Sequence, residues 1–255
     1  MSLETLFGLH GTRALITGAG RGIGFELACG LGSAGARLLI NDREPSMAAA
    51  AVKNLRDQGF DAEAAAFDVT CSDAVVDAMA GLLADQPIDI LVNNAGVNRR
   101  SSIEQVTDAD WHAVVGTNLT ACFHVARAVA PAMRAHGRGR IINIASLLGL
   151  QGKADLVAYS SAKTGLLGLT RALAAELGPA GITVNAVCPG YVRTDLNAHL
   201  FDDPSFFHWL TSRTPSPRLC QPADLVGAVV YLAGPAASMV NGVALSVDGG
   251  MTSVL

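Results

Sequence analysis

Tyr159 and Lys163 lie four positions apart in a stretch rich in Ala and Leu, a composition that favours a helix. Residues at that spacing share one face of a helix, so an ammonium would lie beside a phenol. A free phenol is a poor base at neutral pH because its pKa is about 10, and a neighbouring cation stabilises the phenolate form. The pair therefore predicts a site of proton transfer. Ser146 follows the apolar run 140–145 and adds a hydroxyl at the carboxyl end of a predicted strand.

A glycine-rich turn near the start of the chain predicts a phosphate-binding site. The short apolar run 14–16 is followed by four glycines within 17–24, and then by a helical stretch over 25–31. Glycines let the backbone approach a pyrophosphate closely, and the first turn of the helix presents free N–H groups and a positive dipole end. A second predicted strand over 37–42 ends in Asp42, about where an acidic residue binds the ribose hydroxyls of a dinucleotide.

These features resemble the short-chain dehydrogenase/reductase family over nearly the whole chain. The family's T-G-x-x-x-G-x-G motif matches 17–24, its N-N-A-G motif matches 93–96, and its Y-x-x-x-K motif matches 159–163. The resemblance implies an oxidoreductase whose catalytic residues are Asn118, Ser146, Tyr159 and Lys163. In such an enzyme the Tyr moves the alcohol proton while hydride passes to a nicotinamide, Ser146 hydrogen-bonds the reacting oxygen, and Asn118 holds a water that links Lys163 to solvent.

The resemblance also implies the residues that hold the cofactor, NAD, with NADP as the alternative. They are Gly18, Arg21, Gly22, Ile23, Gly24, Asp42, Asp68, Val69, Asn94, Ala95, Gly96, Tyr159, Lys163, Pro189, Gly190, Val192 and Thr194. Asp42 favours NAD because a carboxylate accepts hydrogen bonds from ribose hydroxyls and repels the 2′-phosphate of NADP. Arg21 and Arg43 can turn toward that phosphate, which leaves the use of both cofactors open.

The segment 192–222 lacks clear periodicity and resembles the family's substrate loop. Its bulky apolar and turn residues favour a lid that closes over substrate, and the alternative is that its aromatic side chains pack only on the core or on a neighbouring subunit. The stretches 39–42, 93–100, 207–215 and 247–251 resemble the branch of the family that acts on gluconate and 5-ketogluconate. The implied substrate is a sugar acid.

Candidate substrate residues are Arg99, Arg100, Ser146 and Trp209. A guanidinium just past the N-N-A-G motif can fork to a substrate carboxylate. The run 147–152 is more apolar than a sugar-acid site requires, so a reductase of a bulkier apolar ketone is one alternative. A 3-oxoacyl thioester reductase is another, because it shares every catalytic residue, and a non-enzymatic dinucleotide sensor is a third.

Strand-like and helix-like segments alternate along the chain, which is typical of a parallel sheet covered on both faces. The predicted strands are 14–16, 37–42, 62–67, 88–92, 139–145, 182–187 and 243–247. Right-handed crossovers then predict a single α/β domain over 1–255, a Rossmann-type doubly wound seven-stranded parallel sheet of strand order 3-2-1-4-5-6-7. Every motif named above would lie at the carboxyl edge of that sheet.

Composition argues against several other classes of protein. Five cysteines without C-x-x-C spacing and six histidines without paired spacing predict neither disulfides nor a metal site, and the cysteines are expected to be buried. A net charge of −4 gives no electrostatic footprint for nucleic acid. Apolar runs broken by charge or glycine, and a first segment without a basic leader, predict a cytoplasmic protein that does not enter a membrane. The small-residue helix over 162–175 and the family resemblance together imply a homotetramer.

Overall fold

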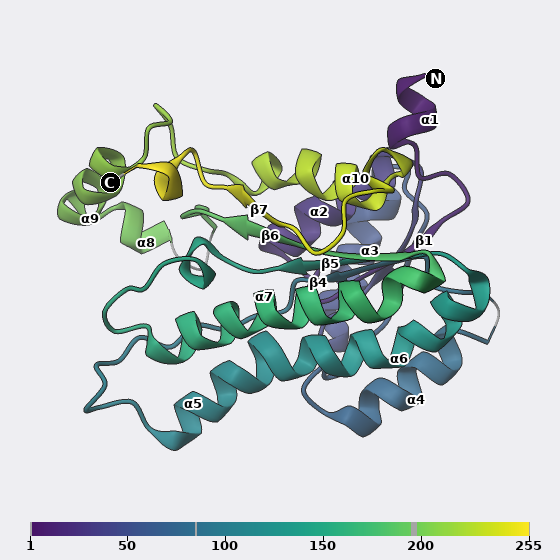
Figure 1. Cartoon of the computed structure of the whole chain (residues 1–255), viewed down its shortest axis with the longest axis horizontal. Helices are drawn as coiled ribbons and strands as arrows, with labels where there is room; N and C mark the ends of the chain where they lie inside the picture. The colour runs from purple at the N-terminus through teal and green to yellow at the C-terminus, as the bar shows by residue number, and fades with distance from the viewer. Residues whose placement is uncertain (1, 85, 195–197, 255) are drawn as a thin grey trace.

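The computed structural model describes residues 2–84, 86–194 and 198–254. Seven parallel strands form one sheet in the order β3-β2-β1-β4-β5-β6-β7 (Figure 1). The predicted strand order and the Rossmann-type fold are therefore confirmed. The strands are β1 (Arg13–Ile16), β2 (Arg37–Ile40), β3 (Ala62–Ala64), β4 (Ile90–Asn93), β5 (Gly139–Ile144), β6 (Ile182–Pro189) and β7 (Ala244–Val247).

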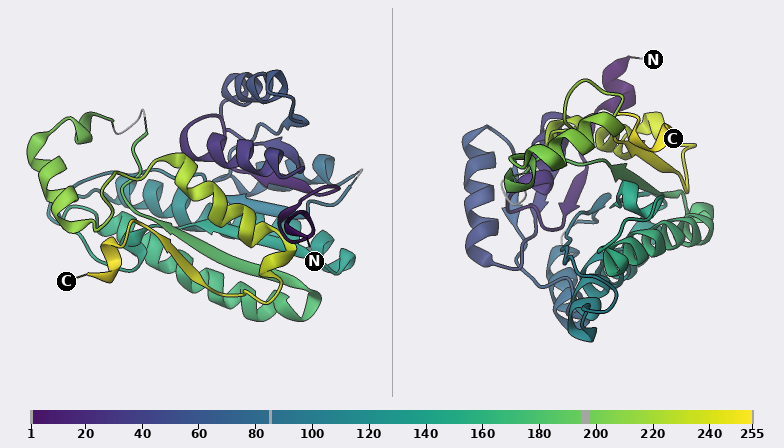
Figure 2. Two further views of the ribbon diagram at one scale, coloured as in Figure 1. Left: turned by 90° about the horizontal axis from the view of Figure 1, so that it is seen from above. Right: turned by 90° about the vertical axis from the view of Figure 1, so that its left-hand side faces the viewer.

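Helices cover both faces of the sheet, as the two views of Figure 2 show. Against one face lie α2 (Gly22–Ser33), α3 (Pro45–Asp57) and α10 (Val226–Ala233), and against the other lie α4 (Ser72–Leu82), α6 (Ala121–His136) and α7 (Val157–Leu177). The remaining α-helices are α1 (Leu3–Phe7), α5 (Asp108–Val115), α8 (Ala198–Phe201) and α9 (Pro204–Arg213). The strands are buried on both sides, which is why their sequences are continuous apolar runs rather than alternating ones.

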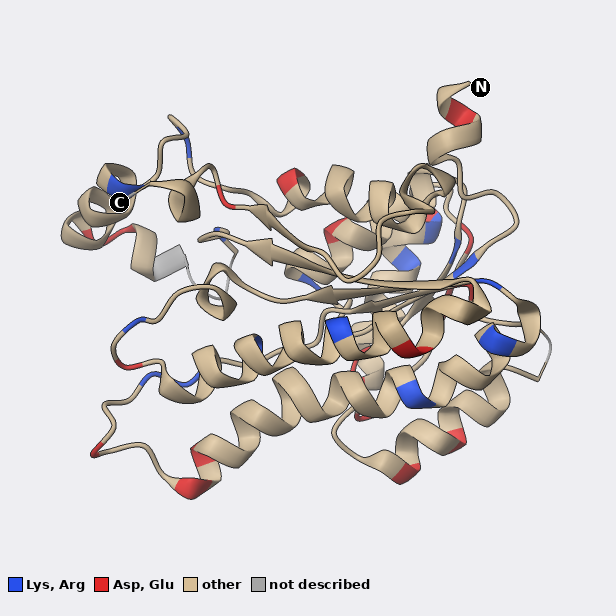
Figure 3. Cartoon of the chain, in the orientation of Figure 1, with Lys and Arg blue, Asp and Glu red and all other residues tan. Residues whose placement is uncertain are grey.

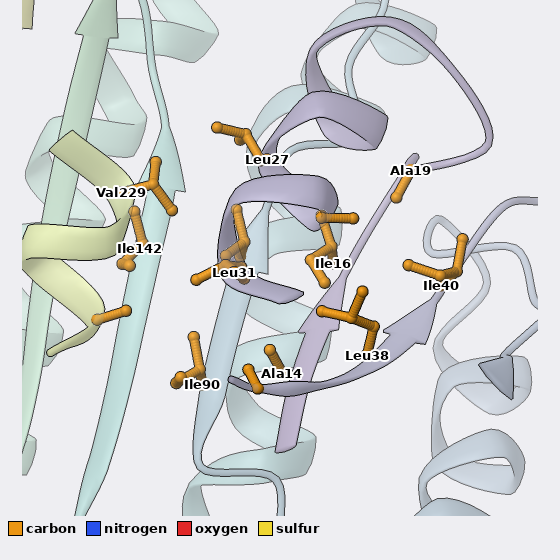
Figure 4. Close-up of a cluster of buried hydrophobic side chains, with 14 of the residues drawn as sticks. Ala14, Ile16, Ala19, Leu27, Leu31, Leu38, Ile40, Ile90, Ile142 and Val229 are labelled. Carbon is orange, nitrogen blue, oxygen red and sulfur yellow. The ribbon is translucent and has the colours of Figure 1, made fainter. Parts of the chain in front are cut away.

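Successive residues of the central strand β1 enter opposite cores, because side chains alternate across a strand. Ile16 packs with Leu27 and Leu31 of α2 in the core drawn in Figure 4, whereas Leu15 belongs to the core beneath α6. The same packing fixes where α2 begins. It places the glycine turn at the carboxyl end of β1, beside the end of β4. The strand order reverses between these two strands.

The helical rod 108–136, which runs from α5 to α6, is long and apolar enough to span a membrane by length and composition, the only such helix in the described residues. The expectation that charge or glycine interrupts every apolar run early does not hold for this rod. Its apolar side chains have a place in the core, because Val125, Val129 and Met133 pack beneath the sheet. Buried core helices of proteins without a membrane span can be equally long and apolar.

Two other expectations need correction. The segment 192–222 is not simply a loop, since it contains α8 and α9, which lie together at one end of the molecule (Figure 1). Its helical period is hidden because apolar residues lie on more than one face of α9. The cysteines are not uniformly buried either: Cys122 and Cys188 are, whereas Cys71 is exposed. Subunit pairing through α7 stays a prediction.

A chain of buried polar side chains ties three elements together below the catalytic edge. Asn93 of β4 donates through Nδ2 to Oδ1 of Asn143 on β5 at 2.9 Å, and Asn143 donates through Nδ2 to Oγ1 of Thr170 on α7 at 2.9 Å. All three residues are at most 2% exposed. Because an unpaired buried amide is costly, this network fixes the rotation of α7 against β5.

We expect Thr170→Val to lower the free energy of unfolding by about 1–3 kcal/mol, because it leaves the Asn143 amide without its acceptor. The matched control is Thr183→Val on β6, whose buried Oγ1 has no hydrogen-bond partner among the described residues. That variant should be neutral or slightly more stable. Urea unfolding of the two variants measures both effects, and equal losses would show that the network does not contribute.

Candidate active site

The predicted catalytic residues meet at the carboxyl edge of the sheet. Ser146 lies two residues past the end of β5, and Tyr159 and Lys163 lie on one face of the first turns of α7. Lys163 is only 4% exposed, and its Nζ donates to the backbone oxygen of Ile144 at 2.7 Å. The same Nζ lies 5.7 Å from the centre of the Tyr159 ring. The structure thus brings an ammonium, a phenol and a hydroxyl together.

The backbone around Ser146 is held by short local contacts. Oγ of Ser146 accepts from the backbone N–H of Leu148 at 3.1 Å, which starts a single 3₁₀ turn. Gly149 ends that turn against α7, and a Cβ added there would meet the Lys163 backbone oxygen at 2.9 Å. The approach of this turn to α7 therefore requires glycine. Sequence reasoning missed Gly149, because no motif marks it.

Asn118 lies in a π-helical turn, Gly116–Thr120, between α5 and α6. It is fully buried, and its Nδ2 donates to the backbone oxygens of Val97 at 2.7 Å and Val114 at 2.8 Å. Its Oδ1 has no hydrogen-bond partner among the described residues. A Cβ added at Gly96 would come within 2.8 Å of this oxygen. The turn thus presents a buried acceptor beside the N-N-A-G segment, and such an acceptor suits a bound water.

The glycine turn is clamped to the end of β4 by side-chain hydrogen bonds. Oγ1 of Thr17 accepts from the backbone N–H groups of Asn94 at 3.0 Å and Ala95 at 3.1 Å. In return, Asn94 donates through Nδ2 to the backbone oxygens of Thr17 at 2.9 Å and Gly18 at 3.0 Å. The Asn94 side chain thus holds the turn in shape, and its predicted contact with the cofactor stays a prediction. Thr17, which sequence analysis treated only as part of a motif, is the other half of this clamp.

Two glycines in the turn have the conformation that a phosphate cradle needs. Gly18 has φ +61° and Gly22 has φ +60°, a region that residues with a side chain rarely adopt. A Cβ at Gly18 would meet Cα of Ala95 at 2.8 Å, whereas a Cβ at Gly22 would meet nothing within 4 Å. Gly22 therefore faces open space at the first turn of α2, where N–H groups can bind a pyrophosphate. Ile23 and the tightly packed Gly24 follow within the same turn.

The predicted adenosine end is formed by residues past β2 and β3. Asp42 is half-buried, its carboxylate lies against Gly20, and its Oδ1 accepts from the backbone N–H of Glu44 at 3.1 Å. The Asp68 carboxylate accepts hydrogen bonds from both the N–H and the hydroxyl of Thr70, and the neighbouring Val69 is buried. Buried Asn41 bridges the two strand ends by donating to the backbone oxygens of Ala65 and Phe67. Sequence analysis missed Asn41.

The opposite wall is formed by the residues after β6. Gly190 donates its N–H to the Val247 backbone oxygen at 3.0 Å, and a Cβ there would meet Cα of Asp248 at 2.9 Å. A cleft of about 660 Å³ separates the glycine turn from this wall. Its lining includes Gly20, Arg21, Gly22, Arg193 and Thr194, and Val192 next to it is buried. The cleft opens beside Gly22, so a phosphate group bound at the glycine turn would lie at its edge.

The two arginines after the N-N-A-G motif have different surroundings. Arg99 donates through Nη1 to Oδ1 of Asp110 on α5 at 2.7 Å, so its charge is already paired. Arg100 is exposed and forms no ion pair with a carboxylate of the described residues. Trp209, on α9, packs edge-on to Tyr191 with ring centres 5.6 Å apart. The predicted substrate residues thus divide: Arg99 is turned to α5, Arg100 is exposed, and Trp209 packs on Tyr191.

The geometry agrees with comparisons to known proteins. The family model described as short chain dehydrogenase matches residues 12–205. The chain belongs to this family. The enzyme is 42% identical to gluconate 5-dehydrogenase of Gluconobacter oxydans, with 99% of each chain covered, and 40% identical to 5-keto-D-gluconate 5-reductase of Escherichia coli K12, with 98% of each covered.

A solved relative shares the fold closely. The gluconate 5-dehydrogenase of Burkholderia cenocepacia, in complex with NADP and tartrate, is 44% identical to this enzyme, with all of both chains covered and a TM-score of 0.97. Family membership and the site geometry make the chain an NAD(P)-dependent oxidoreductase that acts on CH–OH groups. The non-enzymatic sensor considered from sequence is therefore set aside.

Proposed function

We propose that the enzyme interconverts a sugar acid and its keto acid, with gluconate and 5-ketogluconate as the substrate pair. The observation that carries the proposal is the full-length similarity, at 42% and 40% identity, to two enzymes named for that reaction. The charge of Arg100, which pairs with no carboxylate of the described residues and follows the N-N-A-G segment, supports an anionic substrate. A solved relative that holds tartrate, a hydroxy acid, supports it as well.

Two of the apolar residues after Ser146 are buried in side-chain packing. Leu147 and Leu148 are 3% and 7% exposed and pack with Phe201 and Leu210 in a small core beneath α9. Aromatic side chains of the 192–222 segment pack on one another, as in the edge-on contact of Phe201 with Phe206 at 5.8 Å. These contacts weaken the case for a bulky apolar ketone.

The overall charge balance does not favour the docking of an acidic carrier protein that bears a thioester. Figure 3 shows Lys and Arg interspersed with Asp and Glu along the helices and loops, and the net charge is −4. A carrier protein that is acidic would need a basic face. The thioester reductase is therefore the second candidate, to be separated by assay.

We propose that Tyr159 moves the proton of the reacting hydroxyl and that Ser146 donates a hydrogen bond to the same oxygen. The nicotinamide supplies or accepts the hydride when bound. Lys163, buried and fixed on the Ile144 oxygen, places its ammonium beside the phenol ring. Asn118 would hold a water through its unpartnered Oδ1, which opens a route for the proton toward solvent.

Tyr159→Phe should lower kcat by at least about 10²-fold while leaving dinucleotide affinity nearly unchanged, because the ring keeps its shape and loses its proton. Tyr231→Phe, whose ring packs on Phe7 far from the site, is the matched control and should keep full activity. Steady-state kinetics and fluorescence titration of the reduced cofactor provide the two measurements. Turnover of the Tyr159 variant within tenfold of the parent enzyme would refute the mechanism.

The substrate proposal predicts that 5-ketogluconate is reduced with a kcat/KM roughly 10- to 150-fold above that of a neutral ketose, the range expected from one charge-assisted hydrogen bond. The measurement is the absorbance loss of NADPH and NADH with four substrates: 5-ketogluconate, a neutral ketose, a hydrophobic ketone and an acetoacetyl thioester. If kcat/KM for the thioester or for the hydrophobic ketone is higher than that for 5-ketogluconate, the corresponding alternative becomes the assignment.

We propose that the enzyme uses NADP(H) as well as NAD(H). Asp42 was predicted to favour NAD, and the NADP complex of the Burkholderia relative weighs toward the phosphorylated cofactor. Two exposed guanidinium groups offer the charge that a 2′-phosphate needs: Arg21 in the glycine turn, and Arg43 next to Asp42. Arg43 is held only by an exposed pair with Glu44 at 3.6 Å, which costs little to break.

We expect Asp42→Ala to raise the ratio of kcat/KM for NADPH to that for NADH by about tenfold, and Arg43→Ala to lower it by about the same factor, each worth roughly 1.4 kcal/mol. Asp57→Ala, at the end of α3 and paired with Lys53, is the charge-matched control. Initial rates at a fixed saturating substrate give the ratios. If the two site variants shift the ratio in the same direction, the charges do not act as proposed.

A further inference from the structure

Lys153 lies in the turn between the Ser146 segment and α7, where an aromatic cage holds it. Its Nζ is 3.7 Å from the centre of the Trp209 ring and 4.9 Å from that of Tyr191, and Phe206 completes the cage at 5.6 Å. The same Nζ donates a hydrogen bond to the Tyr191 hydroxyl at 2.7 Å. The cage restricts a side chain that would otherwise be freely mobile, so the ammonium has a defined position.

Two arginines approach the cage from different elements. Arg100 is brought near by the backbone bond from the Ser101 N–H to the Asp155 oxygen at 3.0 Å, and Arg213 lies at the end of α9, 5.8 Å from the Trp209 ring. No carboxylate of the described residues forms an ion pair with Arg100, Lys153 or Arg213.

These surroundings act on the Lys153 ammonium. Partial burial, and then the charges of Arg100 and Arg213, lower the pKa of Lys153 to about 8. The three groups therefore repel one another, and an anion that enters among them relieves the repulsion.

The cage adjoins the catalytic residues. Tyr191 directly follows Gly190, and it shares one apolar cluster with Tyr159 and Trp209. Burial raises the pKa of Tyr191 to about 12, so its hydroxyl stays protonated at neutral pH. It accepts from Lys153 and keeps its own proton for another acceptor. An ammonium and a phenol thus present two donors on the substrate side of the catalytic phenol.

We propose that Lys153, positioned by the cage of Tyr191, Phe206 and Trp209 and assisted by Arg100, binds the carboxylate of the substrate and sets the preference of the enzyme for acids over neutral compounds. This inference rests on the proposed function in that the substrate is an anion. Carboxylate binding, which the sequence suggested for Arg99, is thereby assigned to Lys153, because the charge of Arg99 is paired with Asp110. The aromatic side chains of the segment 192–222 then serve to hold a cation.

The decisive variants are Lys153→Met, which keeps an unbranched side chain in the cage and removes the charge, and Lys153→Arg, which restores a cation. Lys153→Met should raise KM for 5-ketogluconate roughly 10- to 150-fold, with kcat and NADPH affinity within threefold of the parent enzyme. Lys153→Arg should recover most of that loss. Arg99→Ala is the matched control and should behave as the parent. Retained NADPH affinity shows that the variants are folded.

A second measurement separates this inference from the proposed function. Calorimetric titration of the NADP-loaded enzyme with tartrate should show binding that Lys153→Met weakens at least tenfold. If the parent enzyme binds tartrate in this way but does not reduce 5-ketogluconate, the anion site stands and the proposed function fails. The inference is overturned if Lys153→Met leaves both the keto-acid KM and tartrate affinity within threefold, or if the parent enzyme neither binds tartrate nor reduces the keto acid.

The pH dependence gives an independent readout. Lys153 is charged below its pKa of about 8 and loses its charge above it, so tartrate affinity should fall as pH rises through that value. The other groups that face Lys153 are the guanidinium groups of Arg100 and Arg213 and the phenol of Tyr191, whose pKa of about 12 lies well above this range. In Lys153→Arg this fall should disappear. An unchanged fall in that variant would assign the titration to another group and count against the inference.

Discussion

The hydrogen bond from the Lys163 ammonium to the Ile144 carbonyl is the contact on which the catalytic edge depends. A charge that is almost wholly buried is costly unless a dipole or an opposite charge compensates it, so this bond limits how α7 can dock on β5. Since Tyr159 is one helical turn before Lys163 and Ser146 is two residues after Ile144, the one bond aligns all three groups. The buried amide chain from Asn93 to Thr170 applies the same constraint farther along the helix.

Close backbone approaches form the rest of the edge. Gly18 against Ala95, Gly149 against α7 and Gly190 against Asp248 each leave less room than a Cβ requires. These contacts draw the ends of the central strands together. The polar groups that do chemistry can therefore lie on short, rigid turns, where a shift of even an ångström would cost catalytic efficiency.

The sequence was sufficient to predict the sheet, its strand order and the placing of Ser146, Tyr159 and Lys163 at the carboxyl edge, because each of these depends on local period or on residues close in the chain. The features that it could not predict depend on distant contacts. Lys153 meets Tyr191 across 38 positions, Arg99 finds Asp110 across 11, and Asn41 reaches the end of β3 across more than 20. The clamping role of Asn94 was also hidden, since a motif names the residue but not the direction of its side chain. The helices of the segment 192–222 were not predicted because the aromatic side chains of α9 pack both on one another and on residues distant in the chain, such as Tyr191 and Lys153.

The π-helical turn at Gly116–Thr120 has a consequence for how this chain can change over evolutionary time. A π turn accommodates one residue more than an α-helical turn of the same rise, and that surplus residue alters the direction in which the side chains after it point. Deleting one amino acid here would restore a regular helix and rotate the residues after the deletion by about 100° relative to those before it. Asn118 would lose its place beside Val97, or the α6 core residues would turn away from the sheet. Outward-facing substitutions in this stretch can be tolerated, whereas a change in its length cannot. Residue count is itself part of the active site.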